Sequence, residues 1–278
     1  MKHILVATDL SPRADRAVGR AFRLADAQGA RLTVLTVMDD AMPDRLAKVM
    51  QPETEAHLKS FCDSLSDDGR IAHVTRVAQG DPSHVIPEVA TSIAADLVVL
   101  GLHRTRGFLD TVRETTLERT LRVTAQPVLL VRDPVDHDYA TVLAAVDFSP
   151  ASSAAIGAAH RLAPAATIHG FHAVAVAIPR GGQFDSPPTT DHNLRDAEDA
   201  RARWMDVTAL PAGMAPPAIR AGGLEAVFDA EFARLKPNLV AVGAHARFSL
   251  THRMLGSLAL QLMRDPPADL LVAKPSTG

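Results

Sequence analysis

Short apolar segments rich in β-branched residues recur along the chain and alternate with segments of helical periodicity. They predict strands at 3–8, 32–37, 71–77, 97–101 and 127–131, and further strands at 141–146, 167–174, 239–243 and 269–273. Nearly continuous apolar strands separated by helices are typical of parallel sheets that helices cover on both faces. The pattern therefore predicts an α/β protein.

The chain contains an internal repeat of one sequence unit. Residues 4–25, ILVATDLSPRADRAVGRAFRLA, match residues 142–163, VLAAVDFSPASSAAIGAAHRLA, at eleven of 22 positions with a constant offset of 138. A second block, which includes Gly80 and Gly222, matches at an offset of 142. The change of offset indicates a net insertion of four residues, which we place in the Pro- and Gly-rich segment 179–193 and expect to be an exposed loop.

The repeat fixes the predicted domain organisation. We expect two tandem doubly wound domains, 1–136 and 137–278, each a five-stranded parallel sheet with helices on both faces. The chain of 278 residues is long enough to bury two cores without help from disulfides or metals.

Composition excludes several classes of protein. The chain has 29 basic and 32 acidic residues, a net charge of −3, which gives no electrostatic footprint for nucleic acid or for an anionic membrane. The single Cys62 cannot form an intrachain disulfide, and the first apolar run is interrupted by Asp9, too early for a signal or membrane segment. We therefore expect a cytoplasmic protein with no nucleic-acid or membrane partner.

Candidate site residues follow from the topology, because ligands of doubly wound sheets bind beyond the carboxyl ends of the strands, where the strand order reverses. Asp9 and Asp147 follow the first strand of each half, and GLHRTRG (101–107) and GAHARFS (243–249) follow the fourth. Asp favours turns and caps, so a structural role for both aspartates is an alternative. Ser11 and Ser149, each followed by proline, predict helix N-caps.

The openings VATDLS and AAVDFS, the passage AQGDPSHVIPEVATSIAADLVVLG at 78–101 and the strand QPVLLV together resemble the universal stress protein family in its tandem form. The resemblance implies an adenine nucleotide alpha hydrolase-like fold and an adenine nucleotide, ATP or AMP, as ligand. It also implies that the first-strand aspartate lies near adenine or ribose. A motif of Gly-x-x-Gly, nine residues, then Gly-Ser/Thr would surround the ribose and phosphates.

Transferred to the second half, this motif is nearly intact, because Ala246 alone replaces a glycine. Gly243 would let backbone approach a ligand, and Gly256 and Ser257 would open a helix whose free N–H groups suit phosphate. The resemblance therefore places the main site in the second half. Its residues would be Asp147, Ala173, Gly243, His245, Ala246, Gly256 and Ser257.

In the first half the motif is degenerate, with Arg104 and Glu114 at two glycine positions. A carboxylate at Glu114 would repel phosphate, whereas Arg104, Arg106 and Arg113 would neutralise it or form a different anion site. The first half is thus expected not to bind ATP in the family manner, and its weaker candidate residues are Asp9, Val37, Gly101, His103, Gly107 and Thr115.

Other chemistry is poorly supported by the sequence. His169 and His172 would face opposite sides of a strand, and the sequence has no HExxH, GxxxxGK[ST] or GxGxxG motif, so we predict neither a metal site nor a catalytic residue. Cys62 and Trp204 are expected to be packed on helices. The family resemblance also implies that the fifth strands of the halves pair as an intramolecular pseudo-dimer, with a homodimer of the whole chain left open.

The hypothesis is a nucleotide-responsive regulatory or interaction protein of the stress response. A slow ATPase or phosphate-transfer protein, which would need Mg²⁺, is one alternative. An interaction module that has lost nucleotide binding is the other.

Overall fold

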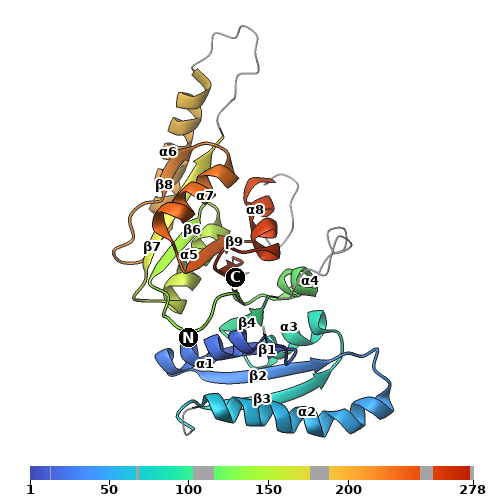
Figure 1. Ribbon diagram of the computed structural model, residues 1–278. Helices are drawn as coiled ribbons and strands as arrows, with labels where there is room; N and C mark the ends of the chain where they lie inside the picture. Colours follow the sequence, from blue (N-terminus) through green and yellow to red (C-terminus); the bar gives the residue numbers. More distant parts are fainter. Residues whose placement is uncertain (13, 67–68, 103–115, 176–187, 245–252, 276–278) are drawn as a thin grey trace. The chain divides into compact units, whose positions relative to one another are not determined.

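The computed structural model describes residues 1–12, 14–66, 69–102, 116–175, 188–244 and 253–275. Contacts divide the chain into two compact units, Met1–Asp138 with Ala268–Leu270, and Tyr139–Pro267 with Leu271–Gly278. Each unit alternates strands and helices (Figure 1).

The first half contains β1 (His3–Thr8), α1 (Ala14–Gln28), β2 (Arg31–Met38), α2 (Asp44–Leu65), β3 (His73–Gln79), α3 (Pro82–Ser92), β4 (Leu97–Gly101), α4 (Thr116–Val123) and β5 (Val128–Val131). The second half contains β6 (Thr141–Ala145), α5 (Pro150–Leu162), β7 (Thr167–Val174), α6 (Pro188–Val207), β8 (Ala218–Ala221), α7 (Leu224–Leu235), β9 (Leu239–Gly243), α8 (Arg253–Arg264) and β10 (Asp269–Ala273).

Each half forms a doubly wound sheet. The strand order is β3-β2-β1-β4-β5 in the first half and β8-β7-β6-β9-β10 in the second. β1 pairs in parallel with β2 and β4, and β6 pairs in the same way with β7 and β9. The predicted fold, two tandem five-stranded parallel sheets, is confirmed.

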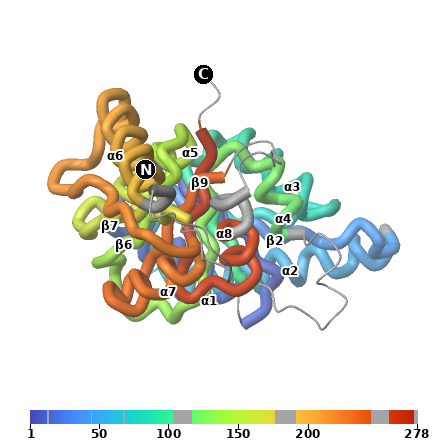
Figure 2. The backbone as a smooth tube through the Cα atoms, turned by 90° about the horizontal axis from the view of Figure 1, so that it is seen from above, coloured from blue at the N-terminus to red at the C-terminus, as the bar shows by residue number. Residues whose placement is uncertain are grey.

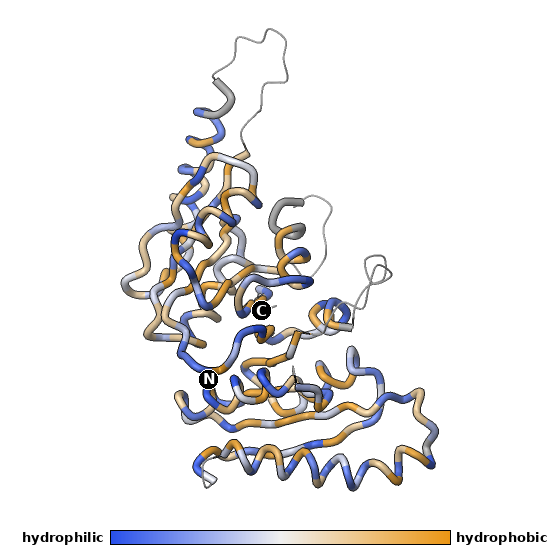
Figure 3. Tube along the Cα trace, viewed as in Figure 1, coloured by the Kyte–Doolittle hydropathy of each residue, from blue (hydrophilic) through white to orange (hydrophobic). Residues whose placement is uncertain are grey.

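The central strands supply the core. Ile4, Leu5 and Val6 on β1 are fully buried, as are Leu97 and Val98 on β4. A strand buried on both faces needs helices on both sides, and Figure 3 shows these strands coloured as hydrophobic along most of their length. On one face of the first sheet α3 and α4 pack against each other, and Figure 2 shows them side by side from above.

Two segments of the second half differ from the sequence prediction. The third strand of the second half, β8, had no apolar run to predict it, because it is short, has no fully buried residue and carries Arg220. α6 begins at Pro188, so residues 188–193 of the expected loop are helical. The rest of that segment, 179–187, lies outside the described residues.

The duplication extends to unusual backbone conformations. Leu10 and Phe148, which occupy the same repeat position, have φ of 60° and 61°. Gly80 and Gly222 share φ of 148°, each just after the third strand of its half. A positive φ is costly for a residue with a side chain, so its recurrence at Leu10 and Phe148 indicates that the fold imposes this turn.

The predicted packing of Cys62 and Trp204 is confirmed. Cys62 on α2 is fully buried, and burial raises the pKa of its thiol to about 12. Trp204 on α6 is 5% exposed, and its indole Nε1–H donates to Ser153 Oγ at 2.9 Å.

Gly243, at the end of β9, is required by helix packing. A Cβ at this position would lie 2.5 Å from the carbonyl carbon of Ala151 and 2.8 Å from the amide nitrogen of Ser152, both in the first turn of α5. These are backbone atoms, so neither can rotate away.

We therefore expect Gly243→Ala to lower the free energy of unfolding by about 1–3 kcal/mol, because the added methyl group forces β9 and α5 apart. Gly157→Ala in α5 is the matched control. Its Cβ would meet a flexible Arg161 side-chain nitrogen at 3.4 Å, so it should be neutral or stabilise by about 0.5–1 kcal/mol. Urea denaturation of both variants measures the difference, and equal stabilities would contradict the packing role.

Candidate functional site

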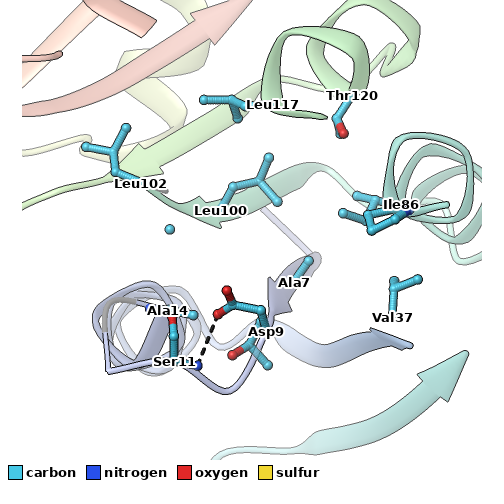
Figure 4. A pocket seen from close by; sticks show the side chains of 13 residues that line it. Ala7, Asp9, Ser11, Ala14, Val37, Ile86, Leu100, Leu102, Leu117 and Thr120 are labelled. Atoms are coloured by element: carbon cyan, nitrogen blue, oxygen red, sulfur yellow. Dashed lines mark hydrogen bonds between the residues drawn. The ribbon is translucent and has the colours of Figure 1, made fainter. Parts of the chain in front are cut away.

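A cavity of about 280 Å³ lies at the carboxyl ends of β1, β2 and β4 in the first half (Figure 4). Its lining residues are Ala7, Thr8, Asp9, Ser11, Ala14, Val37, Pro82, Ile86, Leu100, Gly101, Leu102, Leu117 and Thr120. The strand order reverses between β1 and β4, so the cavity occupies the position where doubly wound sheets bind ligands.

The turn after β1 places Asp9 at the cavity. The backbone N–H of Ser11 donates to Asp9 Oδ1 at 3.0 Å, and the N–H of Leu10 donates to Thr8 Oγ1 at 3.0 Å. Ser11 Oγ in turn accepts from the N–H of Ala14 at 3.4 Å, as expected of a helix cap. Because these bonds and the left-handed Leu10 fix the turn, the exposed Asp9 carboxylate has a defined position at the cavity edge.

The other walls of the cavity are mostly apolar. Figure 4 shows Val37 and Ile86 on one side of Asp9, with Leu100 and Leu117 across the cavity from it. Thr120, which is 1% exposed, adds a hydroxyl on α4. Apolar walls with a carboxylate at one edge suit a flat, weakly polar group that carries hydrogen-bond donors on its rim.

Asp81 connects the two helices that complete the cavity. Its carboxylate caps α3 by accepting from the N–H and the hydroxyl of Ser83, both at 2.8 Å, and it lies 3.3 Å from Arg119 of α4. These hydrogen bonds from Ser83, reinforced by the Arg119 charge, hold the pKa of Asp81 below its ordinary value. Asp81 thus links α3, which supplies Pro82 and Ile86, to α4.

The equivalent turn of the second half has the same backbone and different side-chain contacts. The N–H of Ser149 donates to Asp147 Oδ1 at 3.0 Å, and Ser149 caps α5 by accepting from the N–H of Ser152, which confirms the predicted cap. In addition, the Ser152 hydroxyl donates to Asp147 Oδ1 at 2.6 Å and accepts from the Asp147 N–H at 3.0 Å. Ser152 therefore makes two hydrogen bonds to Asp147.

A second cavity, of about 800 Å³, lies between α5 and α6 of the second half. Its lining residues are Asp147, Phe148, Pro150, Ser153, Ala154, Ala200, Arg203, Trp204, Val207, Thr208, Ala209 and Pro275. Phe148 packs against His172 and Trp204, with ring centroids 4.5 and 5.7 Å apart. This cavity shares one residue, Asp147, with the site predicted for the second half.

The structure brings some predicted site residues together and separates others. Asp9, Val37 and Gly101 line one cavity. In the second half Asp147 lines the α5–α6 cavity, whereas Ala173 is buried and does not line it. His103, Gly107, Thr115, His245 and Ala246, together with Arg104, Arg106, Arg113 and Glu114, lie outside the described residues.

One expectation about the second half needs correction. α8 begins at Arg253, three residues before Gly256, so the prediction that Gly256 and Ser257 open the helix is wrong. The approach of a ligand to the Gly243 backbone stays a prediction, and the α5 backbone occupies the position that a Cβ at Gly243 would take.

Sequence reasoning missed the apolar walls and the contribution of α3 and α4. Pro82 and Ile86 follow the end of β3, and Leu117 and Thr120 lie on α4. The rule that selected residues after the first and fourth strands, applied to the third strand, would have included the segment at Pro82. Leu117 and Thr120 had no signal, because their role depends on how α4 packs.

Within the described ranges the structure shows neither a metal cluster nor a membrane-spanning helix. No group of three His, Cys, Asp or Glu side chains in them is placed to hold a metal ion. Among the helices so described, none is both long and apolar enough to cross a membrane.

Comparison with known proteins finds the same unit twice. The model of the universal stress protein family matches residues 1–132 and again residues 138–274. Universal stress protein A homolog 1 of Coxiella burnetii (strain RSA 493 / Nine Mile phase I) is 28% identical over 141 residues, which cover 47% of this chain and 95% of that protein.

Two solved structures resemble the whole chain in fold. A universal stress protein from Archaeoglobus fulgidus DSM 4304 has a TM-score of 0.70 at 18% identity, and covers 99% of this chain and 97% of its own. A putative universal stress protein from Pseudomonas aeruginosa UCBPP-PA14 has a TM-score of 0.66 at 18% identity, with coverages of 99% and 94%.

The lowered pKa of Asp81 predicts a pH-dependent contribution to stability. A carboxyl whose folded pKa lies below its unfolded value stabilises the protein above the unfolded pKa, near 4, and loses that effect as pH falls through the folded pKa. We expect Asp81→Ala to lower the free energy of unfolding by about 1 kcal/mol at pH 7. The difference from wild type should shrink as the pH falls below about 4 and the Asp81 carboxylate takes up a proton. A difference that stays constant from pH 7 to pH 3 in urea denaturation would contradict this assignment.

Proposed function

The chain belongs to the universal stress protein family, and from that premise we propose that it binds an adenine nucleotide, ATP or AMP, and acts as a nucleotide-responsive regulatory protein. The cavity at Asp9 is proposed to hold the nucleoside part. Its volume, about 280 Å³, is just below the range of about 300–1,000 Å³ typical of small-molecule sites, which suits a nucleoside better than a complete nucleotide.

The observation that carries this proposal is the combination of a carboxylate rim with apolar walls at the switch point of the sheet. Adenine has apolar faces that fit between Val37, Ile86 and Leu100. Its exocyclic amine, or the ribose hydroxyls, can donate to the carboxylate of Asp9. Gly101 at the end of β4 allows a ligand to pass close to the backbone on the way to solvent.

Binding would act by stabilising one arrangement of the elements around the cavity. The α4 residues Leu117 and Thr120 contact the ligand space directly, and Asp81 links α4 to α3. A ligand that binds the native protein stabilises it by RT ln(1 + [L]/Kd), and the elements in contact with the ligand here would include α3 and α4. A partner protein that contacts α3 or α4 would then sense the nucleotide.

A second candidate is the second half, which the nearly intact glycine motif favours. Asp147, Gly243, Gly256 and Ser257 keep the family residue types there, whereas the first half has Glu114 at the position of Gly256. The two candidates differ in which aspartate and which motif binding depends on.

Aspartate variants separate the two candidates. We expect Asp9→Ala to weaken ATP or AMP binding by about ten-fold or more, because a hydrogen bond to a charged group contributes about 1.5–3 kcal/mol. Asp147→Ala, the same change at the same repeat position, should have a much smaller effect. Calorimetric titration with ATP and with AMP, with and without Mg²⁺, measures both. Loss of affinity in Asp147→Ala alone would favour the site in the second half. If the wild-type protein binds neither nucleotide, the remaining alternative is an interaction module that has lost nucleotide binding.

The two candidate sites also predict different nucleotide affinities for the Gly256→Glu variant. This change copies the first-half chemistry into the second half, and it should weaken binding by roughly 2 kcal/mol if phosphates lie there. Binding at the first-half cavity leaves the affinity of Gly256→Glu unchanged. The same samples, incubated with ATP and Mg²⁺ and assayed for ADP, test for a slow ATPase.

A further inference from the structure

We propose that the cavity between α5 and α6 of the second half is a binding site for a small aromatic carboxylate. Its volume, about 800 Å³, lies within the range of about 300–1,000 Å³ typical of small-molecule sites. Its lining combines two aromatic rings, small apolar side chains and an exposed guanidinium. The inference goes beyond the proposed nucleotide function, because the nucleoside is proposed to bind beside Asp9 in the first half.

Two aromatic rings, Phe148 and Trp204, form part of the cavity lining. Their centroids are 5.7 Å apart and their planes are inclined by 52°. The Trp204 indole N–H donates to Ser153 Oγ at 2.9 Å, and Ser153 Oγ lies 3.1 Å from Thr208 Oγ1. Because these polar atoms bind one another, this side of the cavity offers a ligand mainly apolar ring surface, against which another aromatic ring can pack.

Comparison of the two halves shows which side chains leave the cavity open. α2 and α6 end 142 residues apart, which is the offset of the second repeat block. At this offset Ala200 falls on Leu58, which is fully buried in the first half. On α5, Ala154 falls on Arg16 at the offset of 138. Two large side chains of the first half are thus alanine in the second, which leaves room for a ligand beside α5 and α6.

The cation of the lining is Arg203, which is exposed on α6. Among the residues that the structure describes, its guanidinium has neither an ion pair nor a hydrogen-bond partner. Val207, one helical turn further along, also lines the cavity and is 84% exposed. A ligand with an apolar body and a carboxylate would cover Val207 and pair with Arg203, whose planar fork matches a carboxylate.

The acid of the lining, Asp147, does not select a cation instead. Its Oδ1 accepts from the N–H of Ser149 at 3.0 Å and from the Ser152 hydroxyl at 2.6 Å, so it is engaged within the protein. The charge that has no protein partner in the described lining is that of Arg203. The cavity therefore favours an anion over a cation.

Trp204, the only tryptophan of the chain, reports binding by its fluorescence. Phenylbutyrate titrated into the full chain should change this fluorescence saturably. Its neutral amide, phenylbutyramide, should bind about five-fold more weakly because it has no charge to pair with Arg203. Arg203→Gln should weaken phenylbutyrate binding by about the same factor and leave the amide unaffected. Arg195→Gln, the matched change at another exposed arginine of α6, should alter neither affinity.

A second variant tests the cavity itself. Ala200→Leu introduces the first-half side chain and should abolish the saturable change with both ligands, while its thermal unfolding midpoint shows that it is folded. The proposal is overturned if wild type shows no saturable change, if acid and amide bind equally, or if Arg203→Gln or Ala200→Leu binds phenylbutyrate as wild type does. Displacement of phenylbutyrate by AMP would instead identify a nucleotide site and also overturn it. None of these failures affects nucleotide binding beside Asp9, which Asp9→Ala tests separately.

Discussion

Both candidate sites depend on the tight turn that follows the first strand of each half. Leu10 and Phe148 hold left-handed backbone there, a conformation that costs a residue with a side chain about 1–2 kcal/mol. The cost is offset locally by the aspartate, which accepts from the N–H two residues later, and by the serine that caps the next helix. Because this turn lies where the strand order reverses, it also places a carboxylate at the ligand edge of the sheet.

The two halves share this turn but differ in the side chains around it. In the first half the carboxylate of Asp9 borders a cavity with apolar walls, completed by α3 and α4. In the second, Asp147 is held by Ser152, and the neighbouring Phe148 packs against His172 and Trp204. The two halves thus keep the same turn while the side chains packed around it differ.

The fold could be predicted from the sequence because the apolar runs, the repeat and the capping serines all indicate the same architecture. Less of the candidate site could be predicted from the sequence. β8 has no apolar run, and the start of α8 at Arg253 depends on packing that local residue types do not reveal. The glycine motif favoured the second half, but it contained no information about the bond from Ser152 to Asp147. Gly243 illustrates the same limit, since a glycine can make room for a helix as well as for a ligand.

The central claim, that an adenine nucleoside binds beside Asp9, is tested most directly by photolabelling the full chain with 8-azido-ATP and mapping the label by peptide mass spectrometry. Binding beside Asp9 predicts label on peptides of the first half that contain cavity residues such as Val37 or Ile86, and loss of that label when excess ATP competes. Competable label confined to peptides of residues 139–278 would contradict it.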